Sequence, residues 1–151
     1  MDVPGYPDYE VSSSGDVRSK ARISSNGRGA YMRPLKTLAQ HTSPKGYRGV
    51  GLYRDGKYKR HLVHRLMALA FYGPSPLQVR HLNGNPGDNR LSNLAYGTNS
   101  QNQQDSLQHG THVSASKTHC KRGHEFNEAN TYRYVNGNGS PARACRACRR
   151  K

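Results

Sequence analysis

The spacing of apolar positions divides the chain into several short predicted strands and two predicted helices. Residues 47–53 and 58–63 mix apolar and polar positions on either side of Asp55-Gly56, which is the pattern of a β-hairpin. Residues 64–72 are mostly apolar and stop at Gly73-Pro74, because proline cannot continue a helix. This segment therefore predicts a helix with one face packed on the hairpin.

A second helix is predicted after two more short strands, at residues 77–82 and 94–96, which are separated by turn-forming residues. Thr98 is a favourable N-cap, and Gln101 three positions later completes a capping box. The helix is expected to run over residues 99–107. The resulting order is strand, loop, strand, helix.

The ends of the chain carry weaker patterns. Residues 9–12 and 16–19 predict two short strands around the turn at Ser14-Gly15. Residues 23–46 are rich in serine, glycine and basic side chains, which predicts a mobile loop or irregular segment. Residues 106–119 are polar and without periodicity, which is typical of a linker.

These elements predict a small modular α+β protein. Only 32% of the 151 residues are hydrophobic and tryptophan is absent, so small modules in series are expected in place of one large core. The expected division is an N-terminal hairpin module at 1–46, a central module at 47–108, a linker at 109–119 and a C-terminal module at 120–151.

Charge narrows the classes of partner. The net charge is +15, and residues 111–151 alone carry nine basic and two acidic side chains. Such an excess favours a polyanionic partner, most often a nucleic acid, although a basic solvated surface is the plainer alternative. No apolar run approaches the length of a membrane span and no secretory signal opens the chain, which predicts a soluble protein of the cytoplasm.

The three cysteines and one histidine near the C-terminus predict a zinc site of the zinc-ribbon kind. The ligands form a Cys-x3-His pair, Cys120 and His124, and a Cys-x2-Cys pair, Cys145 and Cys148. Three thiolates and one imidazole satisfy tetrahedral Zn²⁺, and the metal would supply folding energy to a segment with few apolar residues. His119 is a weaker alternative ligand, and a redox pair or unpaired thiols are the competing interpretations.

The central module contains three spaced residues, His81, Asn93 and Asn102, with a His-Leu-Asn-Gly-Asn run at the first and an Asn-Leu pair at the second. This stretch resembles the HNH motif, or ββα-metal finger, of endonucleases encoded by phages and mobile introns. The Pro-Gly-Tyr…Tyr-Glu-Val-Ser pattern from Pro4 resembles the DNA-binding module that precedes such domains. The Cys-x-x-Gly-His pattern at Cys120 resembles the zinc motif of some phage HNH proteins.

The resemblance implies a metal-dependent DNA endonuclease of the homing type, which acts on double-stranded DNA and cuts one strand per active site. It implies that His81 is the general base, that Asn93 holds the loop and the imidazole in orientation, and that Asn102 binds Mg²⁺ or Mn²⁺ through its amide oxygen. A neutral histidine can take a proton from water near physiological pH, and a divalent cation can neutralise phosphate charge. A phage-encoded protein of this kind would act in the cytoplasm of its bacterial host.

The sequence departs from the family at Arg80. The residue before the catalytic histidine is often Asp or Asn and binds the metal, but an arginine has no acceptor atom. Arg80 could instead grip the scissile phosphate, Asn83 or Asp88 could replace the lost ligand, or the domain could bind DNA without cutting it. An RNA-binding protein with a zinc ribbon is a further alternative.

Overall fold

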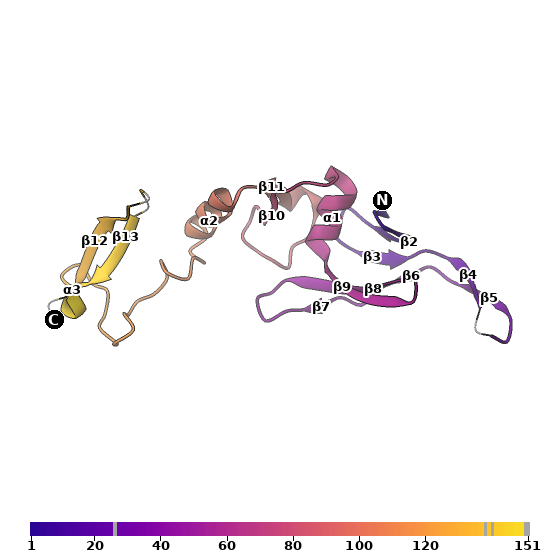
Figure 1. The fold of residues 1–151 in the computed structure, drawn as a ribbon, viewed down its shortest axis with the longest axis horizontal. Coiled ribbons are helices and arrows are strands. Elements are labelled where there is room, and N and C mark those ends of the chain that lie inside the picture. Colours follow the sequence, from indigo (N-terminus) through magenta and orange to yellow (C-terminus); the bar gives the residue numbers. More distant parts are fainter. Residues whose placement is uncertain (26, 138, 140, 150–151) are drawn as a thin grey trace. The chain divides into compact units, whose positions relative to one another are not determined.

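A computed structural model describes residues 1–25, 27–137, 139 and 141–149, and it divides into two compact units. The first unit covers residues 1–109 and the second covers residues 110–151. Figure 1 shows the order of the elements along the chain. The mixture of short strands and helices is the α+β class that the sequence predicts.

The first sheet of the N-terminal unit is antiparallel and has the strand order β1-β2-β3-β6. These strands are Asp2–Val3, Tyr6–Val11, Val17–Ser19 and Lys36–Thr37. The two strands predicted at the N-terminus are therefore confirmed as β2 and β3, with β2 beginning three residues earlier than expected.

The prediction of an irregular segment at residues 23–46 is wrong. This segment contributes β4 (Arg22–Ser25) and β5 (Ala30–Arg33), which pair with each other, as well as β6 and β7 (His41–Thr42). All four residues of β5 are exposed, so the strand has no buried face and no apolar alternation that would reveal it.

The second sheet confirms the predicted hairpin. Strands β8 (Arg48–Arg54) and β9 (Lys57–Leu62) pair in antiparallel register around Asp55-Gly56, and β7 extends the sheet beyond β8. Both turn residues have positive φ, as a two-residue hairpin turn requires. Helix α1 (Val63–Tyr72) follows directly and ends at Gly73, where the sequence predicts it to end.

One hydrophobic core joins the sheets and the first helix. It contains Val3, Tyr9, Val11 and Val17 from the first sheet, Val50 and Leu52 from β8, Val63, Leu66 and Met67 from α1, and Leu94. Because the buried side chains come from both sides of residue 46, the N-terminal strands and the central elements stabilise each other by burying the same apolar surface.

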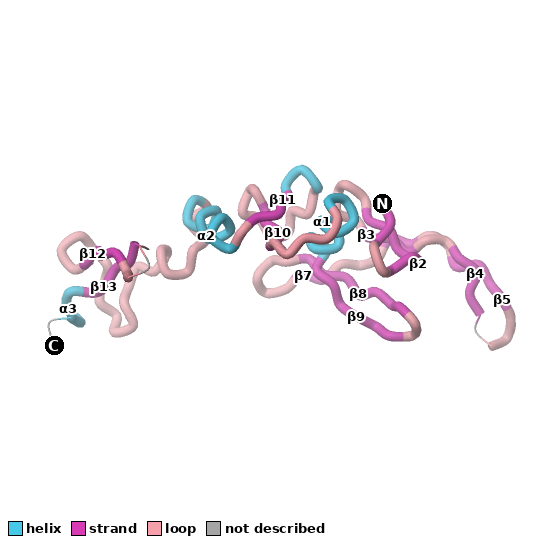
Figure 2. Tube along the Cα trace, turned by 45° about the horizontal axis from the view of Figure 1, so that its top comes forward, coloured by secondary structure: helices cyan, strands magenta, loops and turns pink. Residues whose placement is uncertain are grey.

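The remaining elements of the first unit are a two-stranded sheet and a helix. Strands β10 (Gln78–His81) and β11 (Leu94–Gly97) are antiparallel, and a loop and a short 3-10 helix, Leu91–Asn93, connect them. Helix α2 (Asn99–Gln108) begins at the predicted capping box, in which Thr98 and Gln101 bond reciprocally. Figure 2 shows this order of strand, loop, strand and helix.

The second unit contains an antiparallel hairpin of β12 (Thr131–Val135) and β13 (Pro141–Cys145), followed by the one-turn helix α3 (Arg146–Arg149). The hairpin lies between the two halves of the Cys/His pattern. Residues 138 and 140, which fall between the two strands in the sequence, lie outside the described residues. No described helix has the length and apolar character needed to cross a membrane.

Candidate active site and metal centre

Strand β10 places two of the residues expected at the active site, Arg80 and His81, on opposite faces. Side chains of neighbouring strand residues point to opposite sides of a sheet. Gln78 and Arg80 face helix α2, where they contact Asn102 and Asp105. His81 faces the other way, toward His64 of α1. The site therefore has an imidazole side and an α2 side, separated by the end of one strand.

The imidazole of His81 is half-buried and held by Asn89. His81 Nε2 lies 3.2 Å from Asn89 Oδ1, so Nε2 carries the ring proton as donor and Nδ1 is left with a lone pair. Burial lowers the pKa of His81 below its usual value, although the bond to Asn89 and the charge of Asp88 oppose this shift. The ring is therefore mainly neutral at neutral pH.

Two aromatic neighbours complete the imidazole side. The ring of His81 lies 5.0 Å from that of His64 and 5.9 Å from that of Tyr47, between centroids. His64 is buried, and its burial, with the charge of His81, lowers its pKa to about 4. His64 is thus a neutral packing partner of His81 at neutral pH.

Asn93 is buried and bridges the loop that connects the two strands. Its Oδ1 accepts from the backbone N–H of Asn83 at 2.9 Å, and its Nδ2 donates to the carbonyl of Asp88 at 2.8 Å. These bonds hold the loop closed, whereas the imidazole bond is made by Asn89. Sequence reasoning missed Asn89, because one asparagine among several in a turn-rich loop has no distinguishing spacing.

The two alternative metal ligands, Asn83 and Asp88, accept hydrogen bonds within the loop through their side-chain oxygen atoms. The Asp88 carboxylate accepts from Arg90 Nε at 2.9 Å, from Arg90 Nη2 at 2.7 Å and from Asn83 Nδ2 at 2.8 Å. The hydrogen bonds from Arg90 hold the pKa of Asp88 well below its usual range. Asn83 Oδ1 accepts from the N–H of Asn85. The oxygen atoms of both side chains are thus already engaged in hydrogen bonds that stabilise the loop.

On the α2 side, Asn102 and Arg80 each have a polar neighbour. Asn102 Nδ2 donates to Gln78 Oε1 at 3.0 Å, which leaves Asn102 Oδ1 available to another partner. Arg80 Nη1 lies 3.3 Å from Asp105 Oδ2, and these two side chains are mostly buried. No sequence pattern connects Asp105 with Arg80, which lies 25 positions earlier.

The N-terminal module reaches the same loop. The N–H of Leu91 donates to the carbonyl of Ser13 at 2.8 Å. Gly15 has a φ of +94°, and a Cβ built on it would lie 2.9 Å from Asn89 Cβ. The turn between β2 and β3 therefore packs closely against the residue that orients His81.

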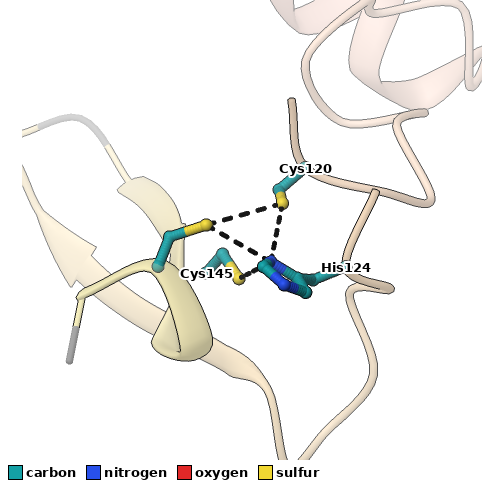
Figure 3. A group of neighbouring side chains, drawn as sticks. Cys120, His124 and Cys145 are labelled. Carbon is teal, nitrogen blue, oxygen red and sulfur yellow. Dashed lines mark hydrogen bonds between the residues drawn. The ribbon is translucent and has the colours of Figure 1, made fainter. Parts of the chain in front are cut away.

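The second unit brings together the four residues predicted to bind zinc. One ligand atom from each of Cys120, His124, Cys145 and Cys148 lies within 4.8 Å of all the others. His124 Nδ1 lies 3.5 Å from Cys120 Sγ, 3.7 Å from Cys145 Sγ and 3.3 Å from Cys148 Sγ. Ligands about 2.0–2.3 Å from a tetrahedral Zn²⁺ stand at such separations. Figure 3 shows the side chains of Cys120, His124 and Cys145 pointing toward one another.

The elements of the second unit explain this convergence. Cys145 ends β13 and Cys148 lies one turn later on α3, while the N–H of Cys120 donates to the carbonyl of His124 at 2.9 Å in a tight turn. The alternative ligand His119 points to Thr118, with Nδ1 2.9 Å from Oγ1. The thiols are free cysteines, so no disulfide competes for them.

Two family matches cover most of the first unit. Residues 61–104 match the family described as HNH endonuclease, and residues 1–53 match the NUMOD4 motif. The first range contains β10, β11 and the beginning of α2, and the second contains the strands of the first sheet. The chain therefore carries an HNH endonuclease domain preceded by a NUMOD4 motif, which confirms the resemblance of the sequence to this family.

A particular relative is also similar to this chain. Over 113 residues, 73% of the chain, it is 33% identical to DNA endonuclease I-HmuI of Bacillus phage SP01. The match spans 58% of that protein's length. The chain is also similar to a solved structure that concerns DNA binding and cleavage by the HNH homing endonuclease I-HmuI. The similarity covers 99% of this chain and 81% of the chain in that structure, with a TM-score of 0.59 and 26% sequence identity.

Proposed function

We propose that the protein is a metal-dependent DNA endonuclease of the homing type. The observation that carries the proposal is the His81 imidazole, which is kept neutral by burial and oriented by Asn89 inside an HNH frame. A general base must be unprotonated at working pH and have a free nitrogen. The similarity to I-HmuI, a DNA endonuclease, supports DNA as the substrate.

In the proposed reaction, His81 Nδ1 takes a proton from a water molecule at the scissile phosphate. The water oxygen forms a bond to phosphorus opposite the 3′-oxygen, the bond from phosphorus to that oxygen breaks, and the released oxygen takes a proton from solvent. Asn89 keeps the ring in the productive tautomer. Asn93 keeps the loop that carries Asn89 closed.

The α2 side fits a divalent cation through Asn102. Its Nδ2 is committed to Gln78, so its Oδ1 is the atom that would bind Mg²⁺ or Mn²⁺. Mg²⁺ keeps several waters and often takes only one or two protein ligands together with substrate phosphates. When bound, the cation would neutralise charge on the phosphate and the leaving oxygen.

We further propose that Cys120, His124, Cys145 and Cys148 hold a structural Zn²⁺ and that the second unit is a nucleic-acid-binding module. In this unit Arg143 of β13 lies 4.4 Å from the Phe126 ring centroid, and Arg149 of α3 lies 4.1 Å from the ring centroid of Tyr132 on β12. The net charge of +15 supports a phosphate-rich partner, for which we propose double-stranded DNA.

The experiment is a nicking assay on supercoiled plasmid and on DNA flanking the gene. Zinc-loaded protein is assayed with Mg²⁺, with Mn²⁺ and without either, and His81→Ala is the matched variant. We expect nicking that requires the cation and disappears in His81→Ala, while DNA binding in a gel-shift assay persists.

Two outcomes would overturn the proposal. Binding to the flanking DNA without cutting by the unmodified protein would identify a DNA-binding protein that only retains the nuclease frame. Tighter binding to structured RNA than to duplex DNA of the same length would identify an RNA-binding protein.

A further inference from the structure

We propose that Arg80 is a catalytic cation that binds the phosphate to be cut, and that Asp105 is the positioning residue that holds it there. The inference rests on the proposed function, because it concerns the same reaction. Two residues, Asp105 and Gly97, contact the Arg80 side chain and fix its position.

The first residue that fixes the position of the Arg80 side chain is Gly97. This glycine is buried on β11, and a Cβ built on it would lie 2.5 Å from Arg80 Cδ and 2.6 Å from Arg80 Nε. Real Cβ atoms essentially never approach other atoms so closely. The absence of a side chain at Gly97 therefore leaves the space that the aliphatic part of Arg80 fills.

The second residue that fixes the position of the Arg80 side chain is Asp105 on α2. Arg80 Nη1 lies 3.3 Å from one carboxylate oxygen and 3.5 Å from the other, so a single nitrogen faces both oxygens. The two side chains are only 16% and 22% exposed. Asp105 lies three positions after Asn102, and residues at this spacing share one helix face. The helix face that contacts Arg80 through Asp105 therefore also carries Asn102, whose amide oxygen is free.

The guanidinium retains unused donors. Arginine has five N–H donors; Arg80 Nε is buried beside Gly97, and Nη1 makes the contact with Asp105, so the N–H groups of Nη2 are the donors available to an outside partner. The planar fork of a guanidinium matches the geometry of a phosphate. The unused donors therefore point to an anion.

The position of Arg80 on β10 indicates that this anion is the phosphate to be cut. Arg80 and His81 are consecutive and point to opposite faces of the strand. A phosphodiester at the end of this strand would have the base on one side and the arginine, with Asn102, on the other. In-line attack needs that arrangement, because the water and the leaving oxygen lie on opposite sides of phosphorus. A fixed cation on the leaving side stabilises the charge that develops there.

The test begins with Arg80→Gln and Asp105→Asn. We expect the nicking rate at saturating Mg²⁺ to fall roughly 100-fold for Arg80→Gln, as for loss of one donor to a transition-state oxyanion. For Asp105→Asn we expect a fall of about tenfold, as for loss of a positioning partner. Asp55→Asn, the same chemical change in the exposed β8–β9 turn, should leave the rate unchanged.

A second readout does not require cutting. Affinity for a fluorescent DNA duplex is measured by anisotropy over a range of salt, with zinc present and without Mg²⁺. Loss of one phosphate contact in Arg80→Gln should lower the salt slope by about one. This readout tests the phosphate contact even if the protein proves unable to cut DNA, so failure of the inference is distinguishable from failure of the proposed function.

A double variant separates catalysis from a purely structural ion pair. Arg80→Met with Asp105→Leu replaces the buried pair by apolar groups of similar size, which is often neutral or stabilising for the fold. We expect its Tm to match that of the unmodified protein and its nicking to be lost. Nicking retained in this variant, or in Arg80→Gln, would overturn the inference, as would an unchanged salt slope.

Discussion

Asn89 controls which ring nitrogen of His81 is available, and its replacement should therefore change the pH dependence of cutting. The base is active above the pKa of His81, which burial lowers, so nicking should persist somewhat below pH 6.5. The bond to Asn89 raises that pKa. In Asn89→Ala the acid limb should move to lower pH while the maximal rate falls by roughly 10–100-fold, because the ring is no longer oriented.

The isosteric Asn89→Asp supplies the matched comparison. Its carboxylate favours the charged imidazolium, so its acid limb should move to higher pH. The measurement is the nicking rate from pH 5 to 8 for the three proteins. Acid limbs that coincide in all three would exclude Asn89 as the partner of the base.

His64 should make the fold sensitive to acid. Its pKa in the folded protein is about 4, below the value of 6.5 expected when unfolded. Between these values the unfolded chain binds more protons, so stability is fully present above pH 6.5 and is lost as the pH falls toward 4. The loss amounts to about 3 kcal/mol. Urea unfolding at pH 7 and pH 4.5 measures it, and His64→Leu should reduce the difference between the two.

Several residues of the site were predictable because their signal lies in spacing along the chain. The four Cys/His residues converge as their pairs predicted. Asn89 and Asp105 were not predictable, because their importance comes from bonds to residues 8 and 25 positions away. No periodicity or motif marks such pairs before the strands and helix are placed.

At the scale of elements, strong local signals located the hairpin of β8 and β9, the two helices and the capping box. The hairpin β4–β5 was not predicted, because a strand with no buried face has no alternation of apolar and polar residues. The same exposure means that its pairing is maintained by backbone bonds and cross-strand neighbours, not by burial.

The turn between β2 and β3 should control the active-site loop. In Gly15→Ala the new Cβ would meet Asn89 at 2.9 Å, and the φ of +94° would be strained for alanine. We expect a loss of about 1–3 kcal/mol in stability together with slower nicking.

Gly56→Ala is the control, because Gly56 also has a positive φ, +73°, but nothing lies within 4 Å of its Cβ position. It should have the backbone strain without the effect on nicking. Thermal unfolding and nicking rates of the two variants measure the difference. Equal nicking rates would show that the turn does not influence Asn89.

For the whole molecule, metal removal should affect the two units differently. Among the described residues of the second unit, Cys145 alone is buried, so the fold of this unit should depend on zinc. The first unit has its own hydrophobic core. Chelation, or Cys148→Ser, should expose residues 110–151 to protease while residues 1–109 stay protected. Limited proteolysis with mass spectrometry measures this, and added Zn²⁺ should restore protection after chelation. Equal protection of both units without zinc would contradict a structural role for the metal.

The shared core of the first unit also has a consequence for inheritance. A genetic crossover near codon 110 would leave the hydrophobic core intact, because every residue of that core belongs to the first unit. A crossover between codons 20 and 50 would separate Val11 and Val17 from Val50 and Met67 and leave both fragments with exposed apolar surface. The NUMOD4 motif and the HNH domain are therefore expected to be exchanged together, while the C-terminal unit is free to be exchanged alone.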